Sequence, residues 1–305
     1  MKISYSSSTT YLGCKRKFWH KKVNKTTLDP DAEVNTQALS LGKAFHKVLE
    51  DCGHNRKKIS STLFHNACET EGVSAIRDKS LVWAMVRKYL DLHIKSGLTV
   101  KTCEIEIGDE NVIGYIDAIM IGPDRTWWIV DLKTAGRLND SLLSRLNFDP
   151  QLNLYAHYAD KVAQALDLDL DKFMGVRYRV TTKSQLKGRK DEDMGSLSKR
   201  MYEAIESYDI PIHKSKLSPE KTFNSLMAIK EEIDNEVVDA PEQYIPQNFS
   251  YCEQYFKPCE YWSRCYGDTF TRCASKNSIS SSQDMKPVDS VVEEDTEYDD
   301  DLGAL

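Results

Sequence analysis

A short apolar run with two charges inside it constrains this chain more than any other feature. The run is TWWIVDLKTA, residues 126–135, and its tryptophans, together with Ile129 and Val130, are typical of a strand buried on both faces. Asp131 and Lys133 do not suit such a strand, because an ionised carboxylate in an apolar setting is costly unless it is paired or binds a metal. The run therefore predicts a buried strand that carries a polar site.

The preceding apolar run supplies a second carboxylate, Asp117. The intervening GPDR is a turn with Pro at its second position, and a three-residue loop with Gly122 facing Thr126 places Asp117 directly opposite Asp131. Lys133 points to the same side as Asp131, because alternate residues of a strand share a face. Opposed carboxylates destabilise a sheet unless a cation lies between them. Mg²⁺ or Mn²⁺ suits carboxylate oxygens, and the alternative is a structural salt bridge from Lys133.

Periodicity along the rest of the chain indicates helices and strands in the order of an α/β (α+β) protein. An α-rich lobe precedes a β-meander, which is followed by a helix, a strand and further helices. The expected helices cover residues 8–23, 36–52, 59–71, 80–95, 150–168, 196–207 and 220–235, and the expected strands cover 100–108, 111–122, 126–135 and 173–182.

Composition places the chain among soluble globular proteins, with 40% hydrophobic and 29% charged residues. We expect no membrane span, because no window of about 18 apolar residues occurs. The first residues, MKISYSSSTT, lack the apolar region of a secretory signal, so we expect an intracellular, cytoplasmic protein, in the host cytoplasm if the source is viral.

The negative charge of the chain is concentrated at its end. Residues 286–305 hold eight acidic residues and one lysine, and this net charge of −7 leaves about +1 for the rest of a chain whose formal charge is −6. Such a body is compatible with a basic groove for nucleic acid. The ending DDDLGAL is a candidate docking peptide for a recombination or replication partner, or a cover for that groove; a purely solubilising tail is the alternative.

Four segments in a fixed order resemble the PD-(D/E)XK nuclease superfamily, specifically its RecB-like branch. In GYIDAIM, Asp117 matches the first acidic residue of the motif, and in VDLKTA, the residues Asp131 and Lys133 match its (D/E)XK part. GKAFHKVLE resembles the upstream G-x-x-x-H helix, which points to His46. QLNLYAHYA resembles the downstream Q-x-x-x-Y helix, whose residues i and i+4 share one face; it points to Gln151 and Tyr155.

The resemblance implies a restriction-endonuclease-like core, with a mixed central sheet flanked by helices. It also implies hydrolysis of phosphodiester bonds with one or two divalent ions, Mg²⁺ or Mn²⁺. Lys133 would orient the attacking water or neutralise charge on the phosphate, and Gln151 and Tyr155 would position the strand or the lysine. Glu104 and Glu106 are second-rank metal candidates, with solvated edge-strand residues as the alternative. The implied metal ligands are His46, Asp117, Asp131 and the main-chain carbonyl of Leu132.

Eight cysteines in a chain of this class indicate reduced thiols or metal ligands. One precedes the nuclease core and three follow it, which resembles the iron–sulfur nucleases of this branch, including AddB-type subunits and CRISPR-adaptation exonucleases. There a [4Fe–4S] cluster staples the two ends of the domain together. Gaps of six and five residues replace the usual C-x-x-C pair, so either Cys252 or Cys273 could complete the cluster. Two alternatives remain open: a Cys₄ zinc site, and scattered buried thiols, as expected for Cys52, Cys68 and Cys103. The implied cluster ligands are Cys14, Cys252, Cys259 and Cys265.

Two basic segments are candidate contacts for DNA phosphates, with a solvated charged surface as the alternative. One surrounds Cys14 and the other is KSQLKGRK, residues 183–190, which follows the strand of residues 173–182. The candidate contacts are Lys15, Arg16, Lys17, Arg177 and Arg179.

The sequence thus predicts a metal-dependent DNA exonuclease of recombination, repair or phage DNA processing. The alternatives are a CRISPR-adaptation or RNA-processing nuclease, and a non-catalytic subunit that binds DNA ends. No G-x-x-x-x-G-K-[ST] helicase motif occurs. The expected regions are a basic N-terminal helix (1–35), the nuclease core with a helical insertion (36–245), a cysteine segment that closes on the N-terminus (246–275) and a disordered acidic tail (276–305).

Overall fold

The computed structural model describes residues 1–26, 36–254 and 257–266. Residues Met1–Tyr261 form one compact unit, and the described part of the second unit is the short helix α11, Trp262–Tyr266. No helix in these ranges is both long and apolar enough to cross a membrane. Cys273 and the predicted acidic tail lie outside the described residues.

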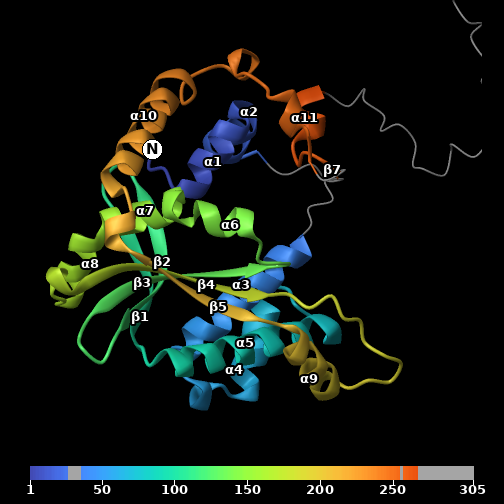
Figure 1. The fold of residues 1–305 in the computed structure, drawn as a ribbon. Helices are drawn as coiled ribbons and strands as arrows, with labels where there is room; N and C mark the ends of the chain where they lie inside the picture. Colours follow the sequence, from blue (N-terminus) through green and yellow to red (C-terminus); the bar gives the residue numbers. More distant parts are fainter. Residues whose placement is uncertain (27–35, 255–256, 267–305) are drawn as a thin grey trace, which may run out of the picture. The chain divides into compact units, whose positions relative to one another are not determined.

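A five-stranded mixed sheet forms the centre of the first unit, in the order β1-β2-β3-β4-β5 (Figure 1). β3 and β4 are parallel, whereas the other neighbours are antiparallel. Parallel neighbours need a long crossover, and helices supply it here between β3 and β4. The strands are β1 (Thr99–Gly108), β2 (Ile113–Ile121), β3 (Trp127–Ala135), β4 (Phe173–Thr182) and β5 (Ser207–His213).

Helices cover both faces of this sheet (Figure 1). One layer contains α3 (Thr36–Cys52), α4 (Ser61–Thr70), α5 (Ile76–Ser96) and α9 (Met194–Ala204). The other contains α1 (Tyr5–Gly13), α2 (Lys15–Phe18), α6 (Asp140–Arg145), α7 (Pro150–His157), α8 (Ala159–Leu166) and α10 (Pro219–Glu236). These elements confirm the predicted α/β fold, a mixed sheet flanked by helices.

Short helical turns and one small hairpin complete the described structure. They are a π-helix (Trp19–Val23), 3-10 turns at Arg56–Lys58, Leu146–Phe148, Leu170–Lys172, Lys214–Lys216, Glu242–Tyr244 and Phe249–Tyr251, and the strands β6 (Glu253–Gln254) and β7 (Lys257–Pro258).

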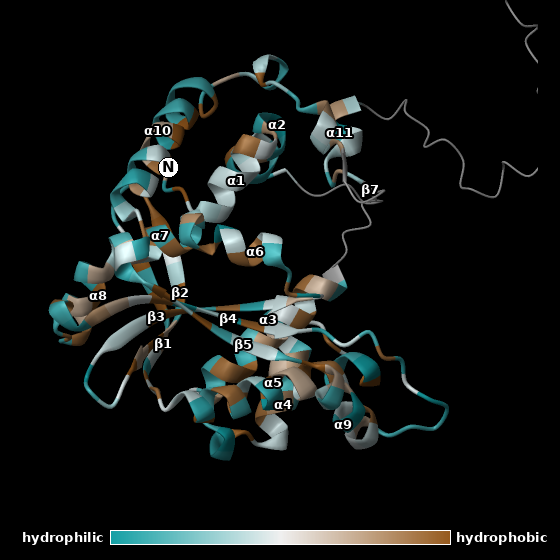
Figure 2. Ribbon diagram, viewed as in Figure 1, coloured by the Kyte–Doolittle hydropathy of each residue, from teal (hydrophilic) through white to brown (hydrophobic). Residues whose placement is uncertain are grey.

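Residues of β3 alternate between two hydrophobic cores, one on each face of the sheet. Trp127 and Ile129 pack with α1, α7, α8 and α10, whereas Trp128, Val130 and Leu132 pack with α3, α4 and α5. In Figure 2 the hydrophobic colour is strong on the strands, while the loop between β4 and α9 is mostly hydrophilic. The sequence of β3 is apolar from Trp127 to Val130 because both faces of the strand are buried there, and Asp131 and Lys133 interrupt this pattern.

Three predicted elements differ from the structure. The helix expected over residues 150–168 is divided at Tyr158 into α7 and α8. The helix expected over residues 8–23 is interrupted at Cys14, whose backbone is extended (φ −157°) and whose Sγ accepts a hydrogen bond from Lys17 N, so that Cys14 caps α2. The helix expected over 196–207 ends at Ala204, and the chain then forms β5, which the sequence did not predict. Pro211 lies in β5, which is an edge strand and so tolerates a proline.

The hairpin between β2 and β3 has the predicted register. Gly122 N donates to Thr126 O (2.7 Å), and Ala118 pairs with Val130. Arg125 takes a left-handed backbone (φ 63°), which closes the three-residue loop. This register brings Asp117 and Asp131 to facing positions.

Candidate active site

The site lies where β2 and β3 separate. Their pairing reaches Ala118 and Val130, one residue short of the two aspartates, and there Asp117 Oδ2 accepts a hydrogen bond from Leu132 N (2.6 Å). The carboxylate of Asp117 thus takes the place of the backbone carbonyl that would otherwise accept this hydrogen bond from the neighbouring strand. The N–H and C=O of one strand residue point to the same edge, so the Leu132 carbonyl lies on the edge that faces Asp117. The two aspartates and this carbonyl border one opening in the sheet.

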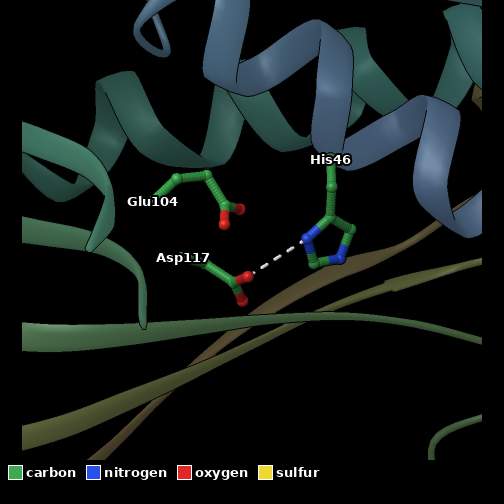
Figure 3. Close-up of side chains that lie close together, drawn as sticks. All are labelled: His46, Glu104 and Asp117. Carbon is green, nitrogen blue, oxygen red and sulfur yellow. Dashed lines mark ion pairs between the residues drawn. The ribbon is translucent and has the colours of Figure 1, made fainter. Parts of the chain in front are cut away.

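Helix α3 brings His46 to this opening. Gly42 permits the close approach, because a Cβ atom there would lie 3.3 Å from Thr134 Oγ1 of β3. His46 follows one turn later on the same face, and its Nδ1 lies 3.2 Å from Asp117 Oδ1 (Figure 3). The G-x-x-x-H spacing therefore combines close packing with the placement of an imidazole.

Glu104 of β1 joins the same cluster, and its carboxylate lies beside that of Asp117, facing the imidazole of His46 (Figure 3). One ligand atom from each of His46, Glu104 and Asp117 lies within 4.8 Å of the others. In the described part of the chain, this is the one group of three or more His, Cys, Asp or Glu side chains close enough to share an ion. The set of one imidazole nitrogen and carboxylate oxygens suits Mg²⁺ or Mn²⁺.

A chain of hydrogen bonds holds Lys133 beside Asp131. Lys133 Nζ donates to Asp131 Oδ1 (2.9 Å) and to Gln151 Oε1 (3.0 Å). Gln151 Nε2 donates to the hydroxyl of Tyr155 (2.6 Å), which donates to the carbonyl of Tyr115 (2.6 Å). The structure therefore brings together the predicted Gln151 and Tyr155 and uses them to orient the lysine from one face of α7.

Asp131 is buried without enough hydrogen bonds and positive charge around it to compensate its carboxylate. The side chain is fully buried, and its Oδ2 has no hydrogen-bond partner. Burial raises the pKa of Asp131 to about 7, although the charge of Lys133 opposes the shift. An unpartnered carboxylate oxygen in this position fits a bound cation, because a buried carboxylate is otherwise costly.

The neighbouring groups respond to one another's charge. Burial by itself raises the pKa of Asp117, but the hydrogen bond and charge of His46 outweigh it and the pKa is lowered. Burial likewise lowers the pKa of His46, but Asp117 outweighs burial and the pKa is raised. In the absence of metal these two groups therefore stabilise each other as an ion pair, which a metal would replace.

The comparison with protein families agrees with this geometry. The model of the PD-(D/E)XK nuclease superfamily matches residues 2–266. The chain belongs to this superfamily. Membership implies a metal-dependent nuclease, and the cluster of His46, Glu104 and Asp117 supplies ligands of the right type. A comparison with curated proteins gives no match.

Of two further lysines that line the cleft of this nuclease, Lys183 was predicted within the basic segment 183–190, whereas Lys43 was not predicted. The cleft, of about 720 Å³, contains His46, Glu104 and Lys133 together with Lys43 and Lys183. Lys43 precedes His46 by three residues and so shares its face of α3. Lys183 follows β4 and is half-buried, and its Nζ donates to the carbonyl of Ala38 (3.0 Å). The i−3 spacing from His46 was the available signal for Lys43.

The basic residues predicted to contact DNA bind other parts of the nuclease. Lys15 pairs with Glu236 (2.9 Å) and Lys17 with Glu260 (2.8 Å). Arg16 Nε donates to the carbonyl of Ile245 (2.9 Å). These contacts pack α2 against the segment that precedes Tyr261.

Arg179 requires a correction, because its side chain is fully buried and cannot contact phosphate. Its Nη2 lies 2.8 Å from Asp209 Oδ2. Arg177 pairs with the other oxygen of Asp209 (2.8 Å) and lies over the ring of Trp128. The charge pattern of β4 therefore reflects pairing with β5.

The predicted cysteine ligands are only partly placed. Cys14 lies next to Gly13, whose carbonyl accepts from Asn248 Nδ2 (2.8 Å), and Cys259 N donates to the carbonyl of Cys252 (2.7 Å). Within residues 1–26, 36–254 and 257–261, these thiols do not form a group of three close enough to share an ion. Cys265 belongs to the second unit.

Proposed function

We propose that this chain is a metal-dependent deoxyribonuclease that degrades DNA from its ends. The observation that carries the proposal is the buried, incompletely bonded Asp131 beside Asp117, with Lys133 held in place next to it. His46, Asp117, Asp131 and the Leu132 carbonyl would hold the divalent ion. When bound, the ion polarises the scissile phosphate and lowers the pKa of the attacking water.

The residues around the ion would orient the reacting groups. Burial lowers the pKa of Lys133, but the charges of Asp131 and Asp117 outweigh it and the pKa is raised, so the ammonium stays charged. Two of its N–H groups are used by Asp131 and Gln151, which leaves one for the attacking water or a phosphate oxygen. Gln151 and Tyr155 keep the ammonium fixed and so reduce the reorganisation needed for reaction.

A DNA substrate is supported by the cations of the cleft. Lys43 and Lys183 lie on the same cleft as His46 and Lys133, where they would contact phosphates on either side of the scissile bond. Preference for DNA ends rests on the resemblance of the four motif segments to the RecB-like branch. We propose recombination, repair or phage DNA processing as the setting, with CRISPR adaptation as the alternative.

The first test is cleavage of end-labelled linear and circular DNA, both single- and double-stranded, with Mn²⁺ or Mg²⁺. We expect degradation of linear DNA that requires the ion and stops when EDTA removes it, because the water and phosphate are activated by the metal. Cleavage of circles would instead assign an endonuclease to the same residues. Folded protein that binds DNA ends without cleaving any substrate would contradict the proposal and favour a non-catalytic subunit.

We also propose that Cys14 takes part in a cysteine-bound iron–sulfur cluster. Burial raises the pKa of the Cys259 thiol, and Cys14 is among the neighbouring groups that raise it further. The hydrogen bond from Asn248 Nδ2 to the Gly13 carbonyl joins the two ends of the first unit, and the backbone hydrogen bond from Cys259 N to the Cys252 carbonyl links residues of the C-terminal segment. Iron bound by these thiolates would join α2 to the C-terminal segment.

Metal content of anaerobically purified protein tests the cluster. We expect about four irons and matching acid-labile sulfide per chain, as Cys₄ ligation of a [4Fe–4S] cluster requires. Cys14→Ser should lose most of the iron, whereas Cys68→Ser, which removes a buried thiol of α4, should retain it. Zinc in place of iron would assign a Cys₄ zinc site, and protein free of both metals would contradict a metal centre.

A further inference from the structure

A cavity between α1, α7 and α10 is separate from the cleft that contains His46. These three helices contact one another on the face of the sheet opposite α3 (Figure 1). The cavity measures about 620 Å³, which is within the range of about 300–1,000 Å³ for sites that hold small organic ligands. Its apolar lining includes Tyr5, Leu12, Phe148, Leu154, Leu226 and Tyr251.

Polar groups on the wall of this cavity are already hydrogen-bonded within the protein. The hydroxyls of Ser8 and Thr9 donate to the carbonyl of Tyr5 (2.8 and 3.0 Å), and the hydroxyl of Ser225 donates one turn back within α10. Asn153 uses both ends of its side-chain amide on backbone groups. An extended peptide needs free backbone partners, whereas a flat apolar ring does not. The cavity therefore suits a ring better than a peptide.

Two apolar side chains line the cavity and yet remain exposed to solvent. Phe148 is 78% exposed and Leu12 is 65% exposed. Neither is among the side chains that pack into the hydrophobic cores of the described chain. Exposed apolar groups gathered at one cavity are typical of a binding groove, so these two side chains serve contact with a ligand better than they serve folding.

A second aromatic ring forms the opposite part of the lining. Gly13 permits Tyr251 to lie against the end of α1, because a Cβ atom at Gly13 would lie 2.7 Å from Tyr251 Cε1. The hydrogen bond from Asn248 Nδ2 to the Gly13 carbonyl (2.8 Å) holds this segment in place. The cavity thus offers the rings of Tyr251 and Phe148, and aromatic rings stack with nucleobases of any sequence.

Helix α7 connects the cavity to the metal site. Pro150 and Leu154 line the cavity. The residues that follow each of them, Gln151 and Tyr155, form the hydrogen-bond chain that holds Lys133. Consecutive residues of a helix point about 100° apart, so the cavity and the catalytic lysine lie against adjacent flanks of one helix. A DNA strand at the metal site can therefore continue across the start of α7 into the cavity.

The charge of the lining suits a nucleotide. Among the described residues that line the cavity, Lys221 of α10 is the one charged side chain, and it is exposed. An apolar cavity with aromatic rings and a single cation matches a planar ring that carries a phosphate. Proteins that bind single-stranded DNA combine these same two features, stacking surfaces and cations along the backbone.

We infer that this cavity is a second DNA site, which takes an unpaired base stacked on Phe148 and the adjoining phosphate on Lys221. The faces of a base inside a duplex are covered by its neighbours, so the site selects DNA that is single-stranded next to the point of cleavage. The inference rests on the proposed function for its choice of DNA as the ligand. It adds to that function a class of substrate and a place where the strand is held.

Binding of a single-stranded oligonucleotide without divalent metal tests the inference independently of cleavage. The oligonucleotide carries 2-aminopurine, whose fluorescence reports how the base is stacked. For Phe148→Ala we expect Kd to rise by about 5–100-fold, the loss found when one stacked aromatic side chain is removed, and the fluorescence change on binding to decrease. Phe148→Tyr should retain both, and Phe148→Leu, which is apolar but has no ring, should not. Kd for a blunt duplex should stay the same.

The salt dependence of the same binding tests Lys221. Lys221→Gln should lower the slope of log Kd against log salt by about 0.7, the contribution of one phosphate contact in a single strand. Lys199→Gln is the matched control, because Lys199 is exposed on α9 in the other helical layer. Ile94→Ala, which removes a 64% exposed apolar side chain of α5, is the control for Phe148→Ala. Neither control should change Kd or the slope.

An affinity of Phe148→Ala for single-stranded DNA equal to that of the wild type would overturn the inference and leave the cavity to another apolar ligand. An equal loss of affinity for the single strand and for the blunt duplex would also overturn it, because the cavity would then not distinguish unpaired bases. Both results leave metal-dependent cleavage untouched. Conversely, loss of single-strand binding confined to the Phe148 and Lys221 variants would support the site even in a protein that cleaves no DNA, so the two proposals fail separately.

Discussion

Asp131→Asn is expected to abolish metal-dependent cleavage while making the metal-free protein more stable. The amide keeps the shape of the side chain but lacks the charge that a divalent ion requires, so kcat/KM should fall by about 10²–10³-fold or more. Asparagine also removes the cost of ionising a fully buried carboxylate. Loss of activity together with gain of stability excludes misfolding as the cause of the loss.

The pH dependence of stability provides the second readout for Asp131. Its pKa is raised to about 7 from an ordinary value of 3.8, so between these limits the folded protein keeps a proton that the unfolded chain releases. The contribution of this group to the free energy of unfolding is fully present below pH 3.8 and is lost as the pH rises through about 7. The gain from Asp131→Asn in the absence of metal should therefore be small at pH 4 and largest above pH 7.

Thermal unfolding with EDTA at several pH values, beside cleavage with Mn²⁺, measures both effects. Asp124→Asn is the control, because Asp124 is exposed in the turn of the same hairpin and its carboxylate accepts a hydrogen bond from Thr126 Oγ1 (2.7 Å). It should cleave DNA normally and gain no stability. Cleavage at the wild-type rate by Asp131→Asn would contradict a role for Asp131 as a metal ligand. Equal free energies of unfolding of the wild type and Asp131→Asn at pH 8 would also contradict it.

Features fixed by short-range rules were predictable from the sequence. The register that places Asp117 near Asp131 follows from one turn, because Gly122 pairs with Thr126 and Arg125 completes the loop. The helix of His46 was predicted to the residue because its apolar stripe is regular and long. The hydrogen bond from Lys133 Nζ to Gln151 Oε1 joins two of the motif segments, and the motifs named both residues.

Features decided by distant partners were not predictable. The break at Cys14 depends on a side-chain cap and on the packing of α2 against residues more than 200 positions away. Strand β5 forms because β4 offers an unpaired edge, which outweighs the weak strand pattern around Pro211. Glu104 was a second-rank candidate because a solvated edge-strand residue was the alternative interpretation, and its left-handed backbone (φ 49°) leaves no pattern in the sequence.

Arg179 shows how one missed element changes the interpretation of a charge. Its partner Asp209 lies in β5, directly across the β4–β5 pair, so an unpredicted strand made the arginine look like a surface cation. The structure surrounds the guanidinium with Asp209, Ser96 Oγ (3.0 Å), His93 Nδ1 (3.2 Å) and the hydroxyl of Tyr89 (3.3 Å). Burial, with the charge of Arg179 as a further cause, lowers the pKa of His93 to about 4, so this imidazole accepts the hydrogen bond as a neutral group.

Asp209→Ala is therefore expected to lower the free energy of unfolding by about 3–5 kcal/mol, because it leaves the fully buried charge of Arg179 uncompensated. Arg177→Ala should cost about 1 kcal/mol or less, although Arg177 binds the same carboxylate (2.8 Å), because its side chain is partly exposed and solvent weakens the pair. Urea unfolding followed by circular dichroism gives both values.

The double variant Arg179→Met/Asp209→Leu separates burial of a charge from loss of packing. Hydrophobic replacements of similar volume should recover most of the stability that Asp209→Ala loses, since neither desolvated charge remains. Recovery would establish the pair as a structural element of the layer between the sheet and α5, with no need for contact with DNA. A loss of less than about 1 kcal/mol in the free energy of unfolding of Asp209→Ala would mean that Arg179 reaches water or another anion in solution. Arg179 would then be accessible to a DNA phosphate.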